Sequence, residues 1–211
     1  MTVIKSRVLI ADDNYLWGKI LTRRLENEGF EVHQAFDGDS AWKLFNEMHF
    51  DICLLDVTMP GIDGFELSRR IRTINKVVPV IFTSGRCMDT DRLAGLMSGG
   101  DDYLAKPFVT EELMLKMNNF ICRSREQKKA GGTTHNIGNY TLDLERLTLS
   151  NNSISVDLSA LEVKLLLALV KNARKVVSRE EIMKDVWGRV DRSTGRSLDV
   201  FISKLRKRFK D

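Results

Sequence analysis

The chain has 211 residues, of which 43% are hydrophobic, 29% charged and 8% aromatic. This length favours two compact domains, and this composition excludes a disordered tail, a collagen-like repeat and a disulfide-stapled miniprotein. The formal net charge of +4 hides an asymmetry, because residues 1–123 hold 15 basic and 18 acidic side chains while 124–211 hold 18 basic and 11 acidic ones.

The sequence carries no signal for export or for membrane insertion. It has no run of about 18 apolar residues, and its first residues lack the apolar stretch of a secretory signal. We therefore expect a soluble, cytoplasmic protein with no membrane partner. Cys53, Cys87 and Cys122 are far apart and form no CxxC pair, so neither a disulfide framework nor a zinc site is expected.

Up to about residue 123, short apolar runs alternate with segments of helical period. The runs, which predict strands, lie at 8–11, 32–35, 52–55, 77–83 and 103–104. The segments that predict helices lie near 14–28, 38–48, 64–75, 89–98 and 110–123. This alternation predicts a doubly wound α/β domain of five strands and five helices, with a parallel sheet covered on both faces. Functional groups in such a fold gather at the carboxyl ends of the strands.

A stretch without apolar periodicity follows, and it carries the pair Gly131-Gly132. We interpret 124–136 as a flexible linker between a first domain of residues 1–123 and a second of residues 137–211.

The second domain begins with short alternating segments at 140–144, 146–149 and 154–156, and three helices follow. Two of these helices start with a capping-box pattern, Ser159-x-x-Glu162 and Ser178-x-x-Glu181. Strands followed by helices predict an α+β domain.

Three carboxylates follow strands of the first domain. Asp12 and Asp13 come after the first predicted strand, and Asp56 comes after the third. If these strands are adjacent and parallel, the carboxylates meet at one edge of the sheet. Like charges this close raise one another's proton affinity unless a cation neutralises them, and oxygen ligands suit a hard ion such as Mg²⁺. A simple turn or helix cap would explain one such Asp, but explains three together less well.

A hydroxyl and an ammonium are expected at the same edge. The fourth predicted strand ends in Thr83-Ser84, and Lys106-Pro107 follows the fifth. Beside a metal held by carboxylates, such groups form a site that lacks only its anion, and a tetrahedral phosphoryl group fits it. Asp56 would then be the nucleophile toward phosphorus. Taken alone, Lys106 is better explained as a solvated loop lysine.

These residues resemble the receiver domain of bacterial two-component response regulators. The resemblance covers about residues 5–123, and the segments that carry it are Asp12-Asp13, 54–64 (LLDVTMPGIDG), Thr83-Ser84 and 101–108 (DDYLAKPF). It implies that Asp56 accepts a phosphoryl group from a sensor histidine kinase.

The resemblance also implies roles for the neighbouring residues. Asp13, Asp56 and the Thr58 carbonyl would bind Mg²⁺ directly, and Asp12 would act mainly through water. Lys106 and the Thr83 hydroxyl would hold the phosphoryl oxygens. An aspartyl phosphate favours the conformer in which Thr83 and Lys106 close on it, and the resemblance implies that Tyr103 turns inward as Thr83 shifts.

The second domain resembles the winged helix-turn-helix DNA-binding domain of the OmpR/PhoB class over about residues 136–210. The segments that carry this resemblance are 158–162, 176–182, 186–188 and 196–207. The last predicted helix places Leu198, Ile202, Leu205 and Phe209 on one apolar stripe. Residues 186–210 hold eight basic and two acidic side chains, and a basic helix face of this kind suits a DNA major groove.

The resemblance assigns the residues of this helix to two kinds of DNA contact. Ser197, Val200 and Lys204 would face base edges, and Arg196, Phe201, Ser203 and Arg206 would lie against the sugar-phosphate backbone. Lys204 stands where an arginine is frequent, and a lysine cannot form the planar fork to guanine. The alternative is a solvated basic face without a ligand.

The resemblance further implies a homodimer through the fourth helix, fifth strand and fifth helix. The charged residues that match this dimer face are Arg92, Asp101, Asp102, Glu112 and Lys116. Met97 stands where a Glu is common, so we expect a weaker or more hydrophobic dimer. The chain ends at Asp211, where the class continues into a β-hairpin wing, so we expect the DNA-binding domain without its wing.

We therefore interpret the chain as a transcriptional response regulator controlled by phosphorylation and dimerisation. Its expected partners are a sensor histidine kinase, double-stranded DNA and a second copy, with RNA polymerase as a further candidate. It is not expected to be an enzyme beyond slow hydrolysis of its own aspartyl phosphate. The main alternative is a phosphorylation-independent regulator of the same architecture. An aspartate-based phosphatase is disfavoured because Thr58 stands where that class has a general-acid Asp.

Overall fold

The structure is a computed structural model that describes residues 5–85, 89–129, 134–144 and 146–209. The chain divides into two compact units, Met1–Cys122 and Arg123–Asp211, and one helix, Thr110–Lys129, runs across the boundary between them. In the described ranges, no helix is both long and apolar enough to cross a membrane.

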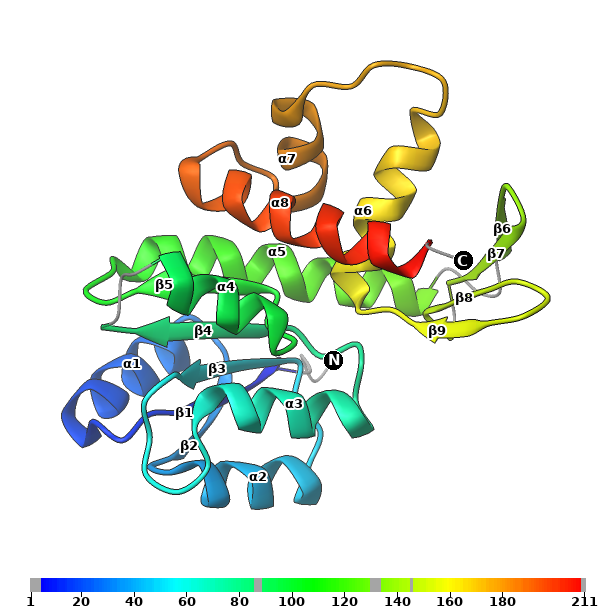
Figure 1. Ribbon diagram of the computed structural model, residues 1–211. Helices are drawn as coiled ribbons and strands as arrows, with labels where there is room; N and C mark the ends of the chain where they lie inside the picture. Colours follow the sequence, from blue (N-terminus) through cyan, green and yellow to red (C-terminus); the bar gives the residue numbers. More distant parts are fainter. Residues whose placement is uncertain (1–4, 86–88, 130–133, 145, 210–211) are drawn as a thin grey trace. The chain divides into compact units, whose positions relative to one another are not determined.

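The first unit is built on a five-stranded parallel sheet in the order β2-β1-β3-β4-β5 (Figure 1). Its strands are β1 (Arg7–Ala11), β2 (Glu31–Ala35), β3 (Ile52–Asp56), β4 (Val80–Ser84) and β5 (Asp102–Ala105). Its helices are α1 (Tyr15–Asn27), α2 (Gly38–Glu47), α3 (Gly64–Ile74), α4 (Asp89–Met97) and α5 (Thr110–Lys129). The predicted alternation of five strands and five helices is confirmed.

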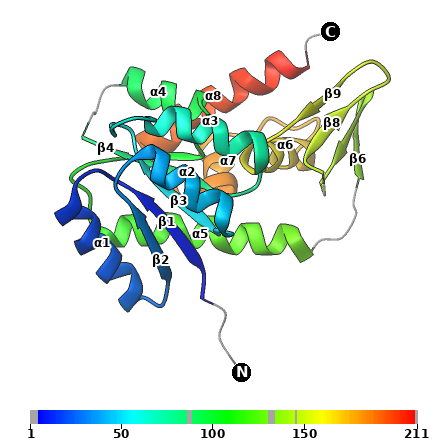
Figure 2. The same cartoon turned by 90° about the horizontal axis from the view of Figure 1, so that it is seen from below.

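Successive side chains of the strands point to opposite faces of the sheet and pack in two separate layers of the core. Leu9, Cys53 and Phe82 belong to one cluster together with Phe45 of α2 and Ile71 of α3. Figures 1 and 2 show α2 and α3 side by side on this face of the sheet, with α1 and α5 on the other. Because both faces are covered, every residue of β3 and β4 is buried, and the strands read as continuous apolar runs.

The predicted fourth strand starts three residues too early. Val77 and Val78 are apolar and β-branched, but the Asn75 side chain accepts hydrogen bonds from both of their backbone N–H groups, at 3.0 and 2.9 Å. This local turn competes with strand pairing, so β4 begins at Val80.

The predicted linker of residues 124–136 is wrong at both ends. Helix α5 continues to Lys129, and β6 (Thr134–Ile137) begins inside the predicted linker. The segment 124–129 (SREQKK) has no apolar face, but Arg, Glu, Gln and Lys are good helix formers and can prolong a helix that has already begun. Residues 130–133, with the glycine pair, lie outside the described ranges.

The second unit opens with a four-stranded antiparallel sheet in the order β6-β7-β8-β9. After β6 come β7 (Tyr140–Asp143), β8 (Thr148–Ser150) and β9 (Ser155–Asp157). Three helices follow, α6 (Ala160–Lys171), α7 (Arg179–Trp187) and α8 (Arg192–Arg208). The predicted α+β order is confirmed.

The helices of this unit start at capping boxes. Those predicted at Ser159 and Ser178 are present, with reciprocal bonds to Glu162 and Glu181. A third box at Asp191, closed by Thr194, starts α8. The pattern of Ser or Thr followed by an acid does not predict this box, because here the acid is at the N-cap and the hydroxyl residue at N3, although both side chains still accept from backbone N–H groups.

Candidate functional site

Five side chains from the ends of four strands lie at the carboxyl edge of the parallel sheet. Asp12 and Asp13 follow β1, Asp56 is the last residue of β3, Thr83 lies near the end of β4, and Lys106 follows β5. Strands β1 and β3 are adjacent and parallel, which was the condition for the predicted carboxylates to meet. In the β3–β4 register Asp56 stands opposite Thr83.

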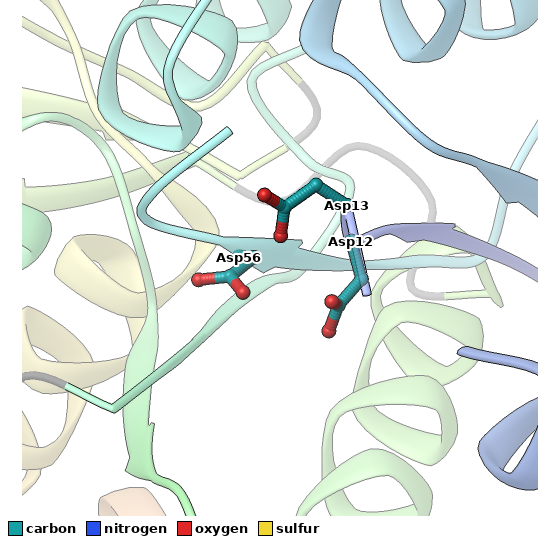
Figure 3. A group of neighbouring side chains, drawn as sticks. All are labelled: Asp12, Asp13 and Asp56. Carbon is teal, nitrogen blue, oxygen red and sulfur yellow. The ribbon is translucent and has the colours of Figure 1, made fainter. Parts of the chain in front are cut away.

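The three carboxylates can offer one oxygen each within 4.8 Å of one another. Figure 3 shows them around one space, with Asp56 from β3 and the other two from the segment after β1. Asp12 and Asp56 are 1% and 8% exposed, whereas Asp13 is exposed. The group is therefore half inside the protein and open to solvent at Asp13.

Lys106 bridges the two buried members of this group. Its ammonium donates to Asp12 Oδ2 at 2.6 Å and to Asp56 Oδ2 at 2.7 Å. The Lys106-Pro107 peptide bond is cis. Asp12 and Asp56 lie 94 and 50 residues before Lys106 in the sequence. Because Lys106 bridges both carboxylates, it is not a solvated loop lysine.

Burial and the contacts of Lys106 compete in setting the pKa values of Asp12 and Lys106. Burial raises the pKa of Asp12, because desolvation of the carboxylate outweighs the opposing hydrogen bond and charge of Lys106. Burial also acts against the charge on Lys106, but its bonds to Asp12 and Asp56 prevail, and the pKa of Lys106 is raised. The site holds more negative charge than one ammonium balances.

This charge imbalance fits a divalent cation. Mg²⁺ takes oxygen ligands and usually keeps several of its waters, which suits a carboxylate group that is open to solvent on one side. Asp12, Asp13 and Asp56 are the residues that would hold the ion. The backbone N–H of Thr58 donates to Asp56 Oδ1 at 3.2 Å, so the backbone of Thr58 runs beside the same carboxylate.

The two expected switch residues are both buried. Thr83 is 3% exposed, and its carbonyl accepts a hydrogen bond from Val57 N. The ring of Tyr103 is also 3% exposed and lies 6.4 Å from the Phe82 ring. Tyr103 therefore lies inside the protein in this conformer.

On α8 the structure divides the predicted DNA-binding residues into two groups. Arg196, Val200 and Lys204 are half-buried, and Ser203 and Arg206 are exposed. These five remain candidates for DNA contact.

Ser197 and Phe201 have to be removed from the list of DNA contacts. They are 0% and 1% exposed, because they lie beside Leu198 and Leu205 on the core side of the helix. Their assignment to DNA contact came from the resemblance, and residue type does not correct it, because a serine and an aromatic residue both occur on either side of an amphipathic helix.

The predicted dimer face also changes. Asp102 and Lys116 are 2% and 4% exposed and form an ion pair within one chain, and Asp101 is paired with Arg72 at 2.7 Å. These three side chains are therefore paired within one chain in this conformer, and their role in contacts between copies stays a prediction. Glu112 is half-buried, and the side chain of Arg92 lies outside the described part of the chain. Sequence alone does not distinguish a pair within a chain from one between chains.

Two ion pairs that sequence reasoning missed hold α8 in place. Arg179, the first residue of α7, makes a bidentate pair with Asp199 at 2.6 and 3.0 Å. Arg208 pairs with Glu162, which also closes the capping box of α6. The Ser159-x-x-Glu162 pattern located that glutamate, but nothing in the sequence points to Arg208 as its partner.

Comparisons with known proteins agree with this arrangement. Residues 8–118 match the family described as response regulator receiver domain, and residues 153–211 match transcriptional regulatory protein, C terminal. The transcriptional regulatory protein RprY of Bacteroides fragilis is 33% identical over 98% of this chain and 88% of its own.

Solved structures give the same result. DrrB of Thermotoga maritima, an OmpR/PhoB homologue, is 28% identical over 97% of this chain and 89% of its own, with a TM-score of 0.53. A RitR mutant shares the fold at 19% identity, with a TM-score of 0.76 over 98% of this chain and 90% of its own.

A receiver domain followed by a transcription-regulatory DNA-binding domain defines the class of two-component response regulators. This chain belongs to the response regulator family, with an OmpR/PhoB-type DNA-binding domain, and it regulates transcription.

Proposed function

We propose that the chain is switched by phosphorylation of Asp56 by a sensor histidine kinase. The observation that carries this proposal is the bridge from Lys106 to Asp12 and Asp56 beside a third carboxylate and a buried threonine. In the transfer, an Asp56 oxygen forms a bond to phosphorus as the bond from phosphorus to the kinase histidine nitrogen breaks, and the electron pair leaves with that nitrogen.

The other side chains of the edge prepare this step. Asp12, Asp13 and Asp56, with the Thr58 carbonyl, would hold Mg²⁺, which when bound supplies positive charge against the carboxylates and the phosphoryl oxygens. Lys106 exchanges its contact with the free carboxylate for a phosphoryl oxygen. The Thr83 hydroxyl donates to a second oxygen, and Tyr103 keeps its inward position in that state.

Phosphorylation then favours a homodimer through α4, β5 and α5. Because Asp101, Asp102 and Lys116 are paired within the chain, apolar contacts carry more of this interface than ion pairs do. Met97 on α4 and Leu115 on α5 are 58% and 67% exposed. The dimer presents two copies of α8 to half-sites about one DNA turn apart, in the cytoplasm where the chromosome lies, and RNA polymerase is a further partner.

The test of the nucleophile is incubation with Mg²⁺ and a small phosphodonor, followed by intact mass measurement. We expect the wild-type protein to gain one phosphoryl group, which hydroxylamine removes because it is an acyl phosphate. Asp56→Asn should gain none. Asp51→Asn is the matched control, because Asp51 stands at the opposite end of β3. Phosphoryl mass on Asp56→Asn would refute the assignment.

The alternative regulator, which needs no phosphate, makes a different prediction for DNA. If it is correct, DNA affinity and oligomer size are the same with and without phosphodonor, whereas the proposed switch requires both to increase.

A further inference from the structure

Phe201 occupies an unusual place on the DNA-reading helix. It is 1% exposed, and its ring lies 6.3 Å from the ring of Trp187, the last residue of α7. The ammonium of Lys204 lies over the same ring, 5.0 Å from its centroid. Trp187, Phe201 and Lys204 therefore form one connected group from the end of α7 to the surface of α8.

The geometry of this group follows from the helix. Residues three apart are neighbours on a helix surface, so Lys204 lies next to Phe201. Trp187 is 3% exposed and holds the ring from the protein side, and Lys204 is half-buried. A lysine ammonium is attracted to the negative face of an aromatic ring, and the attraction is stronger when the ammonium is partly desolvated.

A fixed lysine differs from a free one as a reader of DNA. A free lysine has a flexible four-carbon stem and loses much rotamer freedom when it is held at one base. An arginine reduces this loss through its planar fork, which a lysine lacks. A ring that already holds the ammonium would give the lysine part of the same preorganisation.

We propose that Phe201 is a positioning residue that holds Lys204 for the reading of guanine in the major groove. Guanine offers two acceptors there, O6 and N7, and a lysine ammonium is one of their two usual donors. Phe201 itself does not touch DNA. The inference rests on the proposed function, in which α8 enters the groove, and it adds the base that is read and the residue that makes a lysine suitable for it.

The test starts from the full chain and a randomised double-stranded DNA library, from which the wild-type protein selects its preferred site. Affinity is then measured for this site and for versions with each G·C pair replaced in turn. Phe201→Met keeps apolar bulk but has no aromatic face, and Phe201→Tyr keeps the ring. Thermal unfolding of each variant confirms that binding is measured on folded protein.

We expect Phe201→Met to reduce the preference for G·C at one position by roughly three- to tenfold, with the salt dependence unchanged. Phe201→Tyr should restore this preference. Lys204→Met should lose it at the same position, and the double variant should lose no more than Lys204→Met alone.

Lys207→Met is the matched control, because Lys207 is an exposed lysine on the same helix. It should weaken binding to all sites equally, lower the slope of log affinity against log salt by about 0.9 and add to the effect of Phe201→Met.

The outcomes separate the inference from the proposed function. A wild-type protein that selects no sequence would refute DNA reading by α8 altogether. If the wild-type selects a site but Phe201→Met keeps every preference, or loses affinity equally on all sites, only the positioning role is refuted. Tighter binding by Phe201→Met would overturn it as well, because the ring would then withhold Lys204 from DNA.

Discussion

Buried charges in this protein are paired, and the pairs join distant parts of the chain. Lys116 is bound to Asp102 and Arg208 to Glu162, with both acids almost fully buried. A buried ion without a partner is strongly destabilising, whereas an exposed pair contributes little. The buried pairs should therefore be sensitive to single substitutions.

Lys116→Met should lower the free energy of unfolding by about 3 kcal/mol, because it leaves the Asp102 carboxylate buried without its ammonium. Urea unfolding at low protein concentration measures this. The double variant Asp102→Asn with Lys116→Met should recover part of the loss. Lys43→Met, at a lysine with a 78% exposed side chain, is the control and should change stability by less than about 0.5 kcal/mol. A loss below about 1 kcal/mol for Lys116→Met would contradict the pairing.

Cys53 predicts a pH dependence of stability. Burial raises the pKa of its thiol from 9.0 to about 12. Between these values the folded protein keeps the thiol proton while the unfolded chain releases it, so stability falls as the pH rises through this window. Urea unfolding at about pH 8 and about pH 10 should show a decrease that is smaller in Cys53→Ala.

The same burial protects Cys53 from alkylation in the folded protein. Peptide mass mapping after iodoacetamide should find Cys53 modified only in denaturant. Rapid labelling of Cys53 in the native protein would show that β3 opens far more easily than its burial indicates.

The helices begin at side-chain caps and end at turns that the sequence marks less clearly. Ser178 accepts from Glu181 N, and Glu181 accepts from Ser178 N in return. Because α7 has only nine residues, its first turn is a large part of the helix. The cap is therefore expected to matter for α7 as a whole.

Ser178→Ala should destabilise the second unit by about 1 kcal/mol through loss of this cap. Ser153→Ala, at an exposed loop position, is the control and should stay within about 0.5 kcal/mol of wild type. Chemical denaturation followed by circular dichroism measures both. Equal stability of the two variants would show that α7 does not depend on its capping box.

The turn after α6 holds a residue in an unfavourable conformation. Arg174 is exposed and has φ 66°, in the left-handed region that costs a side chain about 1 kcal/mol. Arg174→Gly should therefore raise the melting temperature, despite the greater freedom of glycine in the unfolded chain. Lys175→Gly, one residue later and without positive φ, should lower it. If both glycines lower the melting temperature, the strain at Arg174 is absent in solution.

At the scale of the whole molecule, two units with separate cores should respond separately to ligands. Among the described residues, the one group of three carboxylates close enough to share a metal ion lies in the first unit. A ligand at 100 times its dissociation constant stabilises the unit that binds it by about 2.7 kcal/mol. We expect calorimetry to show two transitions, of which Mg²⁺ raises only one. Asp13→Asn should remove this shift without moving the other transition, and a shift of both would contradict independent cores.

The sequence predicted which helices and strands are present better than it predicted their first and last residues. Alternating apolar runs located all five strands of the first unit, because strands buried on both faces are apolar throughout. The predicted bounds of β4 and α5 were wrong. A turn made by the Asn75 side chain set the start of β4, and the helix propensity of 124–129 set the end of α5. Each is a local competition between two backbone conformations that differ by about 1 kcal/mol, and a hydrophobic pattern does not reveal it.

The sequence by itself determined which chemical groups follow which strands, since the position of Asp12, Asp13, Asp56, Thr83 and Lys106 after apolar runs is a property of the chain. Only the tertiary structure decided which charges meet and which are covered. It paired Lys106 with two carboxylates, withdrew Asp102 and Lys116 from the surface, and buried Phe201 with the ammonium of Lys204 over its ring. The physical reason is that the spacing of apolar residues predicts which face of a helix or strand is buried only to within about one residue in four. Burial and pairing depend instead on distances between elements that are far apart in sequence.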